Sequence, residues 1–205
     1  MKQLLRMVVS EEMEVKQWLL RFLWGKGLPG LTIRQSEMSL DERGLRHVSV
    51  LEDQLYNDLA LIIETVADET LITSILLQLK KRLKHGQICV TNGLEGDKMN
   101  EHRYYTVKVY TKEDNTWFKK EEYEKVLLFF QEKNAIWTSM TKGIAGYGKD
   151  RVIHTQKMFS LSGKIPVVIE CVVKGDYLNE LLAELKTIVE EGTIFTTPVH
   201  LIENK

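Results

Sequence analysis

The 205-residue chain has few cysteines, few prolines, no long apolar run and no excess of either charge. Cys89 and Cys171 are too few for a disulfide framework or a metal site, so we expect reduced core thiols in a cytoplasmic protein. No apolar run approaches the ~20 residues of a membrane span, and residues 1–10 lack the features of a signal peptide. The net charge of -1 gives no basic excess, which argues against a nucleic-acid partner.

A hydrophobic fraction of 43% is enough for one or two compact domains. Strand-like and helix-like patterns alternate in an order that occurs twice. We expect strands at 4–9, 31–36, 59–66, 88–91, 105–109, 136–142, 165–173 and 193–202, and helices at 13–23, 71–83, 123–130 and 178–189. The fold class is therefore predicted as α+β, with two tandem ferredoxin-like (βαββαβ) domains at 1–96 and 103–205 and a linker at 93–100.

The two halves also share sequence. Residues 59–91 align with 165–197 without a gap. The expected helix starts, Thr70 and Asp176, coincide, as do the glycines expected to end the helices, Gly86 and Gly192. This agreement indicates an internal duplication. The identical positions in the first half are Ile63, Glu64, Val66, Leu76, Leu79, Lys80, Gly86, Ile88 and Thr91.

The third strand of each half is apolar on both faces, although the helices of this fold cover only one. Val167 and Ile169 lie on one face of the strand and Val168 and Val172 on the other, so both faces need cover. We expect docking of the two halves or self-association to supply it. Glu64 and the matching Glu170 interrupt these strands, and structural pairing at the resulting interface is favoured over catalysis.

One stretch, Thr141–Leu161, has the features of a ligand site. It contains Gly143, Gly146 and Gly148 directly after a strand, but no helix pattern follows, which argues against a dinucleotide fingerprint. The glycines are also consistent with a hairpin-like connection, although 22 residues from 143 to 164 exceed the usual ~4–6 of a loop.

The basic residues near these glycines form a candidate anion cradle, with a solvated loop as the alternative. Lys142 and Arg151 are predicted to hold the anion, and Tyr147 could stack on a base. His154 could sense pH, and a metal role is disfavoured for a single histidine. No nucleophile–base pair can be named, so we expect no enzyme and no cofactor, although action on phosphate esters stays a third alternative. The candidate ligand-binding residues are Lys142, Gly143, Gly146, Tyr147, Gly148, Arg151 and His154.

The run Lys142-Gly143-Ile144-Ala145-Gly146-Tyr147-Gly148, then Ile153-His154-Thr155 and the strand Ile165-Pro166-Val167-Val168-Ile169-Glu170, resembles a known family. It is similar to the PII-like "domain of unknown function one-ninety" proteins, over residues 103–205. The resemblance implies ferredoxin-like subunits that trimerise through their sheets. It also implies a signalling role, an adenine nucleotide in a subunit cleft and a flexible loop that contacts a partner, such as a membrane transporter.

Two departures from that pattern limit what carries over. The place of the PII phosphate loop is taken by a short acidic turn containing Glu190 and Glu191, which would repel a polyphosphate. The first half matches the family only in the order of its strands and helices. When the ungapped alignment of the halves is extended, residues 37–42 fall opposite the glycine motif, and neither Gly44 nor His47 aligns with a glycine or histidine. We therefore expect a regulatory protein, a homo-oligomer formed as a trimer of chains, that senses a small anion or nucleotide through its second half. The alternative is a structural or protein-interaction module without a small ligand.

Overall fold

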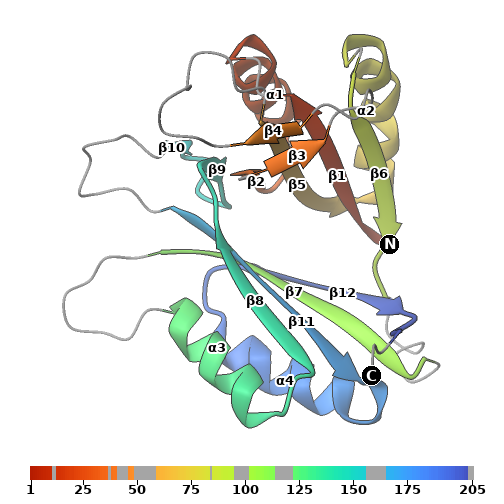
Figure 1. Cartoon of the computed structure of the whole chain (residues 1–205), viewed down its shortest axis with the longest axis vertical. Helices are drawn as coiled ribbons and strands as arrows, with labels where there is room; N and C mark the ends of the chain where they lie inside the picture. The colour runs from red at the N-terminus through yellow and green to blue at the C-terminus, as the bar shows by residue number, and fades with distance from the viewer. Residues whose placement is uncertain are drawn as a thin grey trace.

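The computed structural model describes residues 1–10, 13–36, 38–40, 46–48, 59–83, 85–94, 102–113, 122–155 and 165–202. Most of the linker expected at 93–100 lies outside these residues, and so does the boundary between the two expected domains. The chain folds as two halves, each with one main antiparallel sheet and two helices (Figure 1), and the first half also holds a separate two-stranded sheet.

The first half contains the strand–helix order that its sequence predicts, with a short extra hairpin in the middle. Alternating apolar residues form the strands, and apolar residues at helical spacing form the helices that cover them. Its elements are β1 (Lys2–Ser10), α1 (Met13–Gly25), β2 (Leu31–Gln35), β3 (Met38–Leu40), β4 (Arg46–Val48), β5 (Ala60–Asp68), α2 (Glu69–Arg82) and β6 (Gln87–Asn92).

The second half repeats this order, including a hairpin in the same place. Its elements are β7 (Tyr104–Lys112), α3 (Glu122–Glu132), β8 (Trp137–Lys142), β9 (Ala145–Tyr147), β10 (His154–Thr155), β11 (Pro166–Lys174), the short 3-10 helix η2 (Gly175–Tyr177), α4 (Leu178–Ile188) and β12 (Thr193–Val199). The second-half sheet has the order β12-β7-β11-β8, and the equivalent strands of the first half follow β6-β1-β5-β2. Both orders are those of the ferredoxin-like fold, so this prediction is confirmed.

The strand pairing supports the internal duplication. Arg6 pairs with Glu64 in the first half, and Lys108 pairs with Glu170 in the second. β5, α2 and β6 of the first half thus correspond to β11, η2–α4 and β12 of the second, as the ungapped alignment predicts. The helices of each half pack on one face of their own sheet and bury separate apolar cores.

The glycine-rich segment of the second half belongs to the sheet of the first. Strands β9 and β10 extend the first-half sheet, giving the order β10-β9-β2-β5-β1-β6. Figure 1 shows β8 leaving the second-half sheet and leading directly into β9 beside β2. We name residues 143–155 the glycine hairpin. Because this hairpin completes the other half's sheet, the two halves are joined by backbone hydrogen bonds as well as by side chains.

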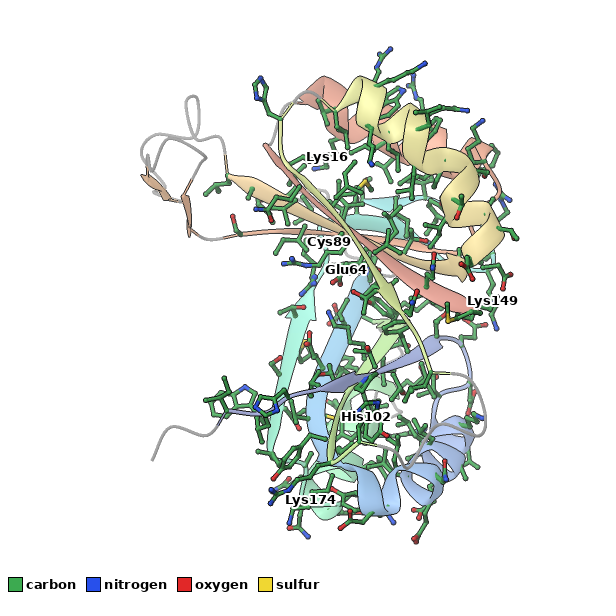
Figure 2. The ribbon with its side chains drawn as sticks, turned by 90° about the vertical axis from the view of Figure 1, so that its right-hand side faces the viewer. Lys16, Glu64, Cys89, His102, Lys149 and Lys174 are labelled. Carbon is green, nitrogen blue, oxygen red and sulfur yellow. The ribbon has the colours of Figure 1, made fainter. Side chains whose placement is uncertain are left out.

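The faces of the two sheets that carry no helix are turned toward each other (Figure 1). Val168, on the helix-free face of β11, is 2% exposed, whereas Val172 and Ile62 are half-buried. Glu64 lies where the halves meet (Figure 2) and binds Lys108 of the second-half sheet at 3.1 Å. Docking of the two halves therefore supplies much of the expected second-face cover.

Three local predictions are wrong. Thr70 does not cap α2, because the helix begins at Glu69 with Asp68 at the N-cap position. Cys89 is exposed, because β6 is an edge strand with little cover, whereas Cys171 is buried as expected and both thiols are free. Gly86 does adopt a positive φ of 107°, but it serves the turn into β6, since α2 already ends at Arg82.

The register of the first-half hairpin also differs from the sequence alignment. Ser39 pairs with His47 in the first half, and Gly146 pairs with His154 in the second. His47 is thus the counterpart of His154, contrary to the prediction, because the first half has one extra residue between its hairpin and β5. Within the described ranges, none of the helices combines the length and apolarity needed to cross a membrane.

Candidate functional site

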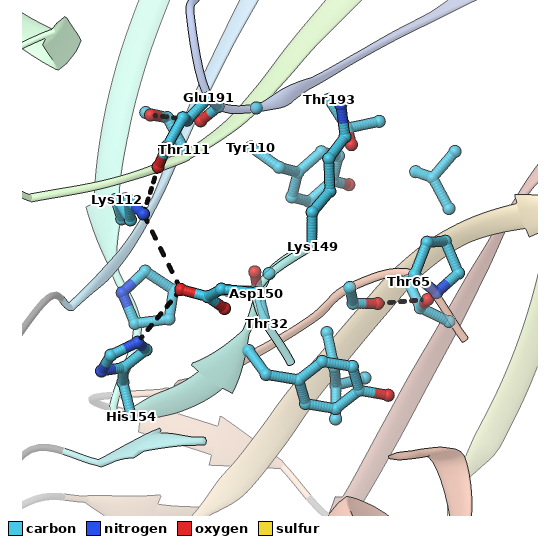
Figure 3. A pocket seen from close by; sticks show the side chains of 18 of the residues that line it. Thr32, Thr65, Tyr110, Thr111, Lys112, Lys149, Asp150, His154, Glu191 and Thr193 are labelled. Atoms are coloured by element: carbon cyan, nitrogen blue, oxygen red, sulfur yellow. Dashed lines mark hydrogen bonds and ion pairs between the residues drawn. The ribbon is translucent and has the colours of Figure 1, made fainter. Parts of the chain in front are cut away.

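A cavity of about 230 Å³ lies between the two halves and is lined in part by the glycine hairpin (Figure 3). The first half contributes the turn before β2 and the middle of β5, and the second half contributes the end of β7, the hairpin and the turn before β12. We call it the interdomain cavity. Its polar lining includes Thr32, Glu64, Thr65, Tyr110, Thr111, Lys112, Lys149, Asp150, His154, Glu190, Glu191 and Thr193.

Asp150 organises one wall of this cavity. Its carboxylate lies 3.8 Å from Lys112 Nζ and 3.8 Å from His154 Nε2, and it accepts a hydrogen bond of 3.2 Å from the Val152 N–H. Burial opposes its ionisation, but the Val152 N–H and the two neighbouring bases together hold the pKa of this carboxyl below its usual value. Lys112 also forms an ion pair with Glu191 of the acidic turn, so it links the hairpin to that turn.

Two of the residues that line the cavity have a buried polar atom without a hydrogen-bond partner among the described residues. One is the Tyr147 hydroxyl. The other is the Nε2 atom of His154, because the Asp150 carboxylate at 3.8 Å is beyond hydrogen-bond distance. Burial raises the pKa of Tyr147 above its usual value, against a smaller opposing influence of the Arg151 charge. A buried polar atom without a partner costs roughly 1–3 kcal/mol. A ligand that supplied the missing partners would recover part of that cost.

The glycines of the hairpin are explained by the close approach of β9 to the first half. A Cβ on Gly146 would lie 2.2 Å from the Leu31 carbonyl oxygen and 2.7 Å from Pro166. A Cβ on Gly143 would lie 3.0 Å from the Ile33 carbonyl oxygen. Gly148, by contrast, has only the Asp150 carboxylate at 3.8 Å, so it borders the cavity without a steric requirement.

The two residues predicted to hold an anion lie outside the cavity. Lys142 forms an ion pair of 2.7 Å with Glu113 and lies over the Tyr123 ring. Arg151 stacks on Trp24, with its guanidinium carbon 4.7 Å from the ring centroid.

Arg151 fastens the glycine hairpin to the end of α1. Its guanidinium donates a hydrogen bond to the Trp24 carbonyl oxygen, and Trp24 Nε1 donates one of 3.0 Å to the Arg151 carbonyl. A left-handed backbone at Arg151, with φ of 55°, accompanies these contacts. Among the predicted site residues, Tyr147, Gly148 and His154 line the interdomain cavity, Gly143 and Gly146 allow the hairpin to dock, and Arg151 anchors it.

Glu64 is the most enclosed charge at the junction between the halves. Its side chain is 0% exposed and contacts Arg34 at 2.6 Å, Lys108 at 3.1 Å and Arg6 at 3.6 Å. The Tyr110 hydroxyl donates a further hydrogen bond of 3.3 Å, and burial together with Glu64 raises the pKa of that hydroxyl. The predicted structural pairing of Glu64 is confirmed at the junction between the two halves of one chain, and pairing between chains stays a prediction.

Sequence reasoning missed several lining residues because they come from distant strands and turns. Lys112 ends β7 and Thr65 lies within β5, where neither residue stands out in the sequence. Lys149 and Asp150 were visible within the glycine-rich stretch, and their proximity to His154 could have been proposed from the short loop. Among the residues that the structure describes, no three His, Cys, Asp or Glu side chains converge as a metal site would require.

The second half of the chain matches the family model DUF190, described as "Uncharacterized ACR, COG1993", over residues 104–201. The chain is 30% identical over 80 residues to a "UPF0166 protein" of Aquifex aeolicus, which covers 39% of this chain and 76% of that protein. It is 27% identical over 100 residues to "UPF0166 protein MJ1524" of Methanocaldococcus jannaschii, covering 48% and 92%. The chain belongs to the DUF190 family. The resemblance seen in the sequence is confirmed, and this family is uncharacterised in function.

Two solved structures were also compared with the whole chain. One is titled "Crystal Structure of an Unknown Protein from Galdieria sulphuraria", with 15% identity and a TM-score of 0.32. The other is a "putative glycine cleavage system transcriptional repressor", with 14% identity and a TM-score of 0.34. Each alignment covers 97% of this chain and 98% of the other. The fold assignment of this DUF190 protein rests on its own strand order.

Proposed function

We propose that this DUF190 protein is a non-enzymatic regulatory module that binds a small polar ligand in the interdomain cavity. The observation that carries the proposal is that the cavity is lined by Tyr147, Lys149, Asp150 and His154 of the glycine hairpin and by β2 and β5 of the first half. A ligand there contacts both halves and the strand-forming segment that joins them. Its binding would stabilise the docked hairpin, and the hairpin would relay occupancy to a partner.

The charges around the cavity indicate the class of ligand. Two lysines, Lys112 and Lys149, face four carboxylates, those of Glu64, Asp150, Glu190 and Glu191. Glu64 is already neutralised by Arg34 and Lys108, and Glu191 by Lys112, so Lys149 is left to bind one anionic group. A polyphosphate is disfavoured, because its further charges would be repelled by the acidic turn. The volume of about 230 Å³ is also below the ~300–1,000 Å³ common for drug-sized ligands. A nucleoside monophosphate or a small anion with one ionised group therefore fits this site better than ATP.

Lys149 is the residue best placed to hold the anionic group. In the described part of the chain it forms no ion pair, whereas Lys112 is bound to Glu191. Tyr147 would offer its unpartnered hydroxyl to the same ligand. The two side chains would thus bind different polar atoms of one small molecule.

Calorimetric titration of the full chain with AMP, ADP, ATP, inorganic phosphate and citrate tests the proposal. We expect AMP or one small anion to bind once per chain, and we expect ATP to bind more weakly than AMP. Lys149→Ala should weaken that binding at least tenfold, and Tyr147→Phe should weaken it several-fold. Lys142→Ala is the matched control, since Lys142 lies in the same segment but outside the cavity. Binding lost in Lys142→Ala and unchanged in Lys149→Ala would contradict the assignment, as would no binding by any compound.

A protein-interaction module without a small ligand is the second candidate. The observation in its favour is that Gly146 is needed for docking of the hairpin, with or without a ligand, because a Cβ would lie 2.2 Å from the Leu31 carbonyl oxygen. This candidate predicts that no compound of the panel binds, whereas Gly146→Ala still abolishes capture of a partner. Partner capture that depends on a compound of the panel would instead favour the ligand-responsive module.

A further inference from the structure

The two halves differ at one edge of their sheets: the edge strand of the first half is paired with a further strand, and the equivalent edge strand of the second half is not. Strand β2 is covered by β9, which pairs Leu31 with Tyr147, Thr32 with Gly146 and Ile33 with Ala145. Strand β8 is the equivalent strand of the second half, since Thr32 pairs with Glu64 and Ser139 pairs with the matching Glu170. In the described part of the chain, no strand pairs with the outer edge of β8.

The side chains show the consequence of this difference. Leu31 and Ile33 of the covered strand are 3% and 0% exposed, whereas their counterparts on the open strand, Thr138 and Met140, are half-buried. Trp137, at the start of the open strand, is 74% exposed, and Ile136 just before it is 41% exposed. An open edge beside a large exposed aromatic side chain is a site at which another strand can add.

The backbone of β8 is oriented for such an addition. In an antiparallel pair, alternate residues direct their N–H and C=O groups toward the same neighbouring strand. The Gly143 N–H donates to the Pro166 carbonyl of β11 at 2.7 Å, so the odd-numbered residues of β8 direct these groups toward β11. The N–H and C=O groups of Thr138 and Met140 therefore point away from β11, toward the open edge. Ile33, the counterpart of Met140, uses its outward carbonyl to accept a hydrogen bond of 2.8 Å from the Ile144 N–H.

Among the described strands, one hairpin does not join a larger sheet. Strands β3 and β4 form a two-stranded sheet of their own, whereas the equivalent β9 and β10 extend the first-half sheet. The equivalence is close, because the Ser39–His47 pair of the first hairpin corresponds to the Gly146–His154 pair of the second. Each hairpin directly follows the edge strand of its own half.

We propose that strand β3 of one chain adds to the open edge of β8 in a second copy of this chain. The contact repeats between chains the pairing that β9 makes with β2 within one chain, with Ser39 opposite Ser139. Ser39 has a Cβ where Gly146 has none, so β3 would lie at the usual strand spacing of about 4.8 Å rather than in the close approach of β9. Each chain then offers one hairpin and one edge, a head-to-tail contact that closes into a ring or continues as a filament.

The first test measures the assembly of the full chain by light scattering after size exclusion and by native mass spectrometry. We expect a species that is a multiple of the 23.8 kDa chain. Thr138→Pro removes an outward N–H from the edge of β8 and should shift the protein to the monomer, whereas the control Thr138→Val keeps that N–H and should assemble normally. A monomeric parent protein, or a folded Thr138→Pro variant with unchanged mass, would overturn the proposal.

A second test stays informative if the proline variant does not fold. In a Cys89→Ser background, Ser39→Cys combined with Ser139→Cys should form disulfides between chains under mild oxidation, because opposite residues of paired strands suit disulfide geometry. Non-reducing electrophoresis should then show covalent multiples of the chain. Ser39→Cys combined with Lys80→Cys, a site on the exposed surface of α2, is the matched control. Monomer alone in the Ser39/Ser139 pair, or equal multiples in both pairs, would overturn the proposal.

Discussion

Replacing Glu64 by glutamine tests how firmly the two halves are joined. The carboxylate is 0% exposed and is surrounded by Arg34 at 2.6 Å, Lys108 at 3.1 Å and Arg6 at 3.6 Å. Glutamine keeps the shape but removes the charge. Arg34, at 14% exposed, then loses its closest carboxylate, and Lys108, at 12% exposed, keeps only its ion pair with the part-exposed Glu170. Breaking a buried ion pair in this way costs about 3–5 kcal/mol.

The internal duplication supplies a matched control. Glu170 occupies the same position in the second half, but its side chain is 40% exposed and its ion pair with Lys108 spans 3.1 Å. A pair with that much solvent contact is worth about 1 kcal/mol or less. Glu170→Gln should therefore have little effect on the free energy of unfolding.

Denaturant and thermal unfolding of the two variants measure the difference. For a chain of this size, about 3 kcal/mol lowers Tm by roughly 6–12 °C. We expect that decrease for Glu64→Gln and a few degrees or less for Glu170→Gln. Equal effects of the two substitutions, or a Glu64→Gln effect below about 1 kcal/mol, would refute the argument that Glu64 joins the halves.

Three further predictions concern the glycine hairpin and the thiols. Gly146→Ala should lower Tm and open residues 143–155 to proteolysis, because its Cβ would lie 2.2 Å from the Leu31 carbonyl oxygen. Gly148→Ala should do neither, because its Cβ would have only the Asp150 carboxylate within 4 Å. Tyr147→Phe should raise the free energy of unfolding of the ligand-free protein by about 1 kcal/mol in denaturant unfolding, because it removes a buried hydroxyl without a partner. A lower free energy of unfolding would contradict this prediction. At pH 8 a thiol reagent should modify the exposed Cys89 and leave Cys171 unreacted until the protein unfolds, because burial raises the pKa of the Cys171 thiol to about 12. Reaction of both thiols in the folded protein would contradict this prediction.

The pH dependence of stability follows from the buried Tyr147. Burial raises the pKa of its hydroxyl above the usual value of about 10, so the folded state holds this proton more tightly than the unfolded state. The resulting stability is fully present below about pH 10 and is lost as the pH rises toward the folded pKa. Tyr147→Phe should therefore show a smaller loss of Tm between pH 9 and pH 11 than the parent protein, and an equal loss in both would contradict this.

Much of the fold could be predicted from the sequence because the signals are local. Apolar periodicity located the strands and helices, and the ungapped repeat from Glu64 to Glu170 matched the halves in register. The short strands β3 and β4 were missed, because three residues in a charged segment carry no measurable period. The extra residue after that hairpin hid the equivalence of His47 and His154.

The candidate site was predictable only in part. The glycine motif indicated the correct segment, and Tyr147, Gly148 and His154 do line the interdomain cavity. The sequence could not show that this segment joins the sheet of the other half, because that pairing depends on how the halves dock. The same docking places Arg151 against Trp24 rather than near a ligand.

Hydrogen exchange of the full chain, with and without each compound of the titration panel, tests the proposed ligand site most directly. We predict that at least one compound slows exchange in two separate segments, the hairpin at 143–155 and the turn and strand at 30–32, because both line the interdomain cavity. Exchange that is unchanged by every compound, or slowed only in segments away from that cavity, would contradict the account.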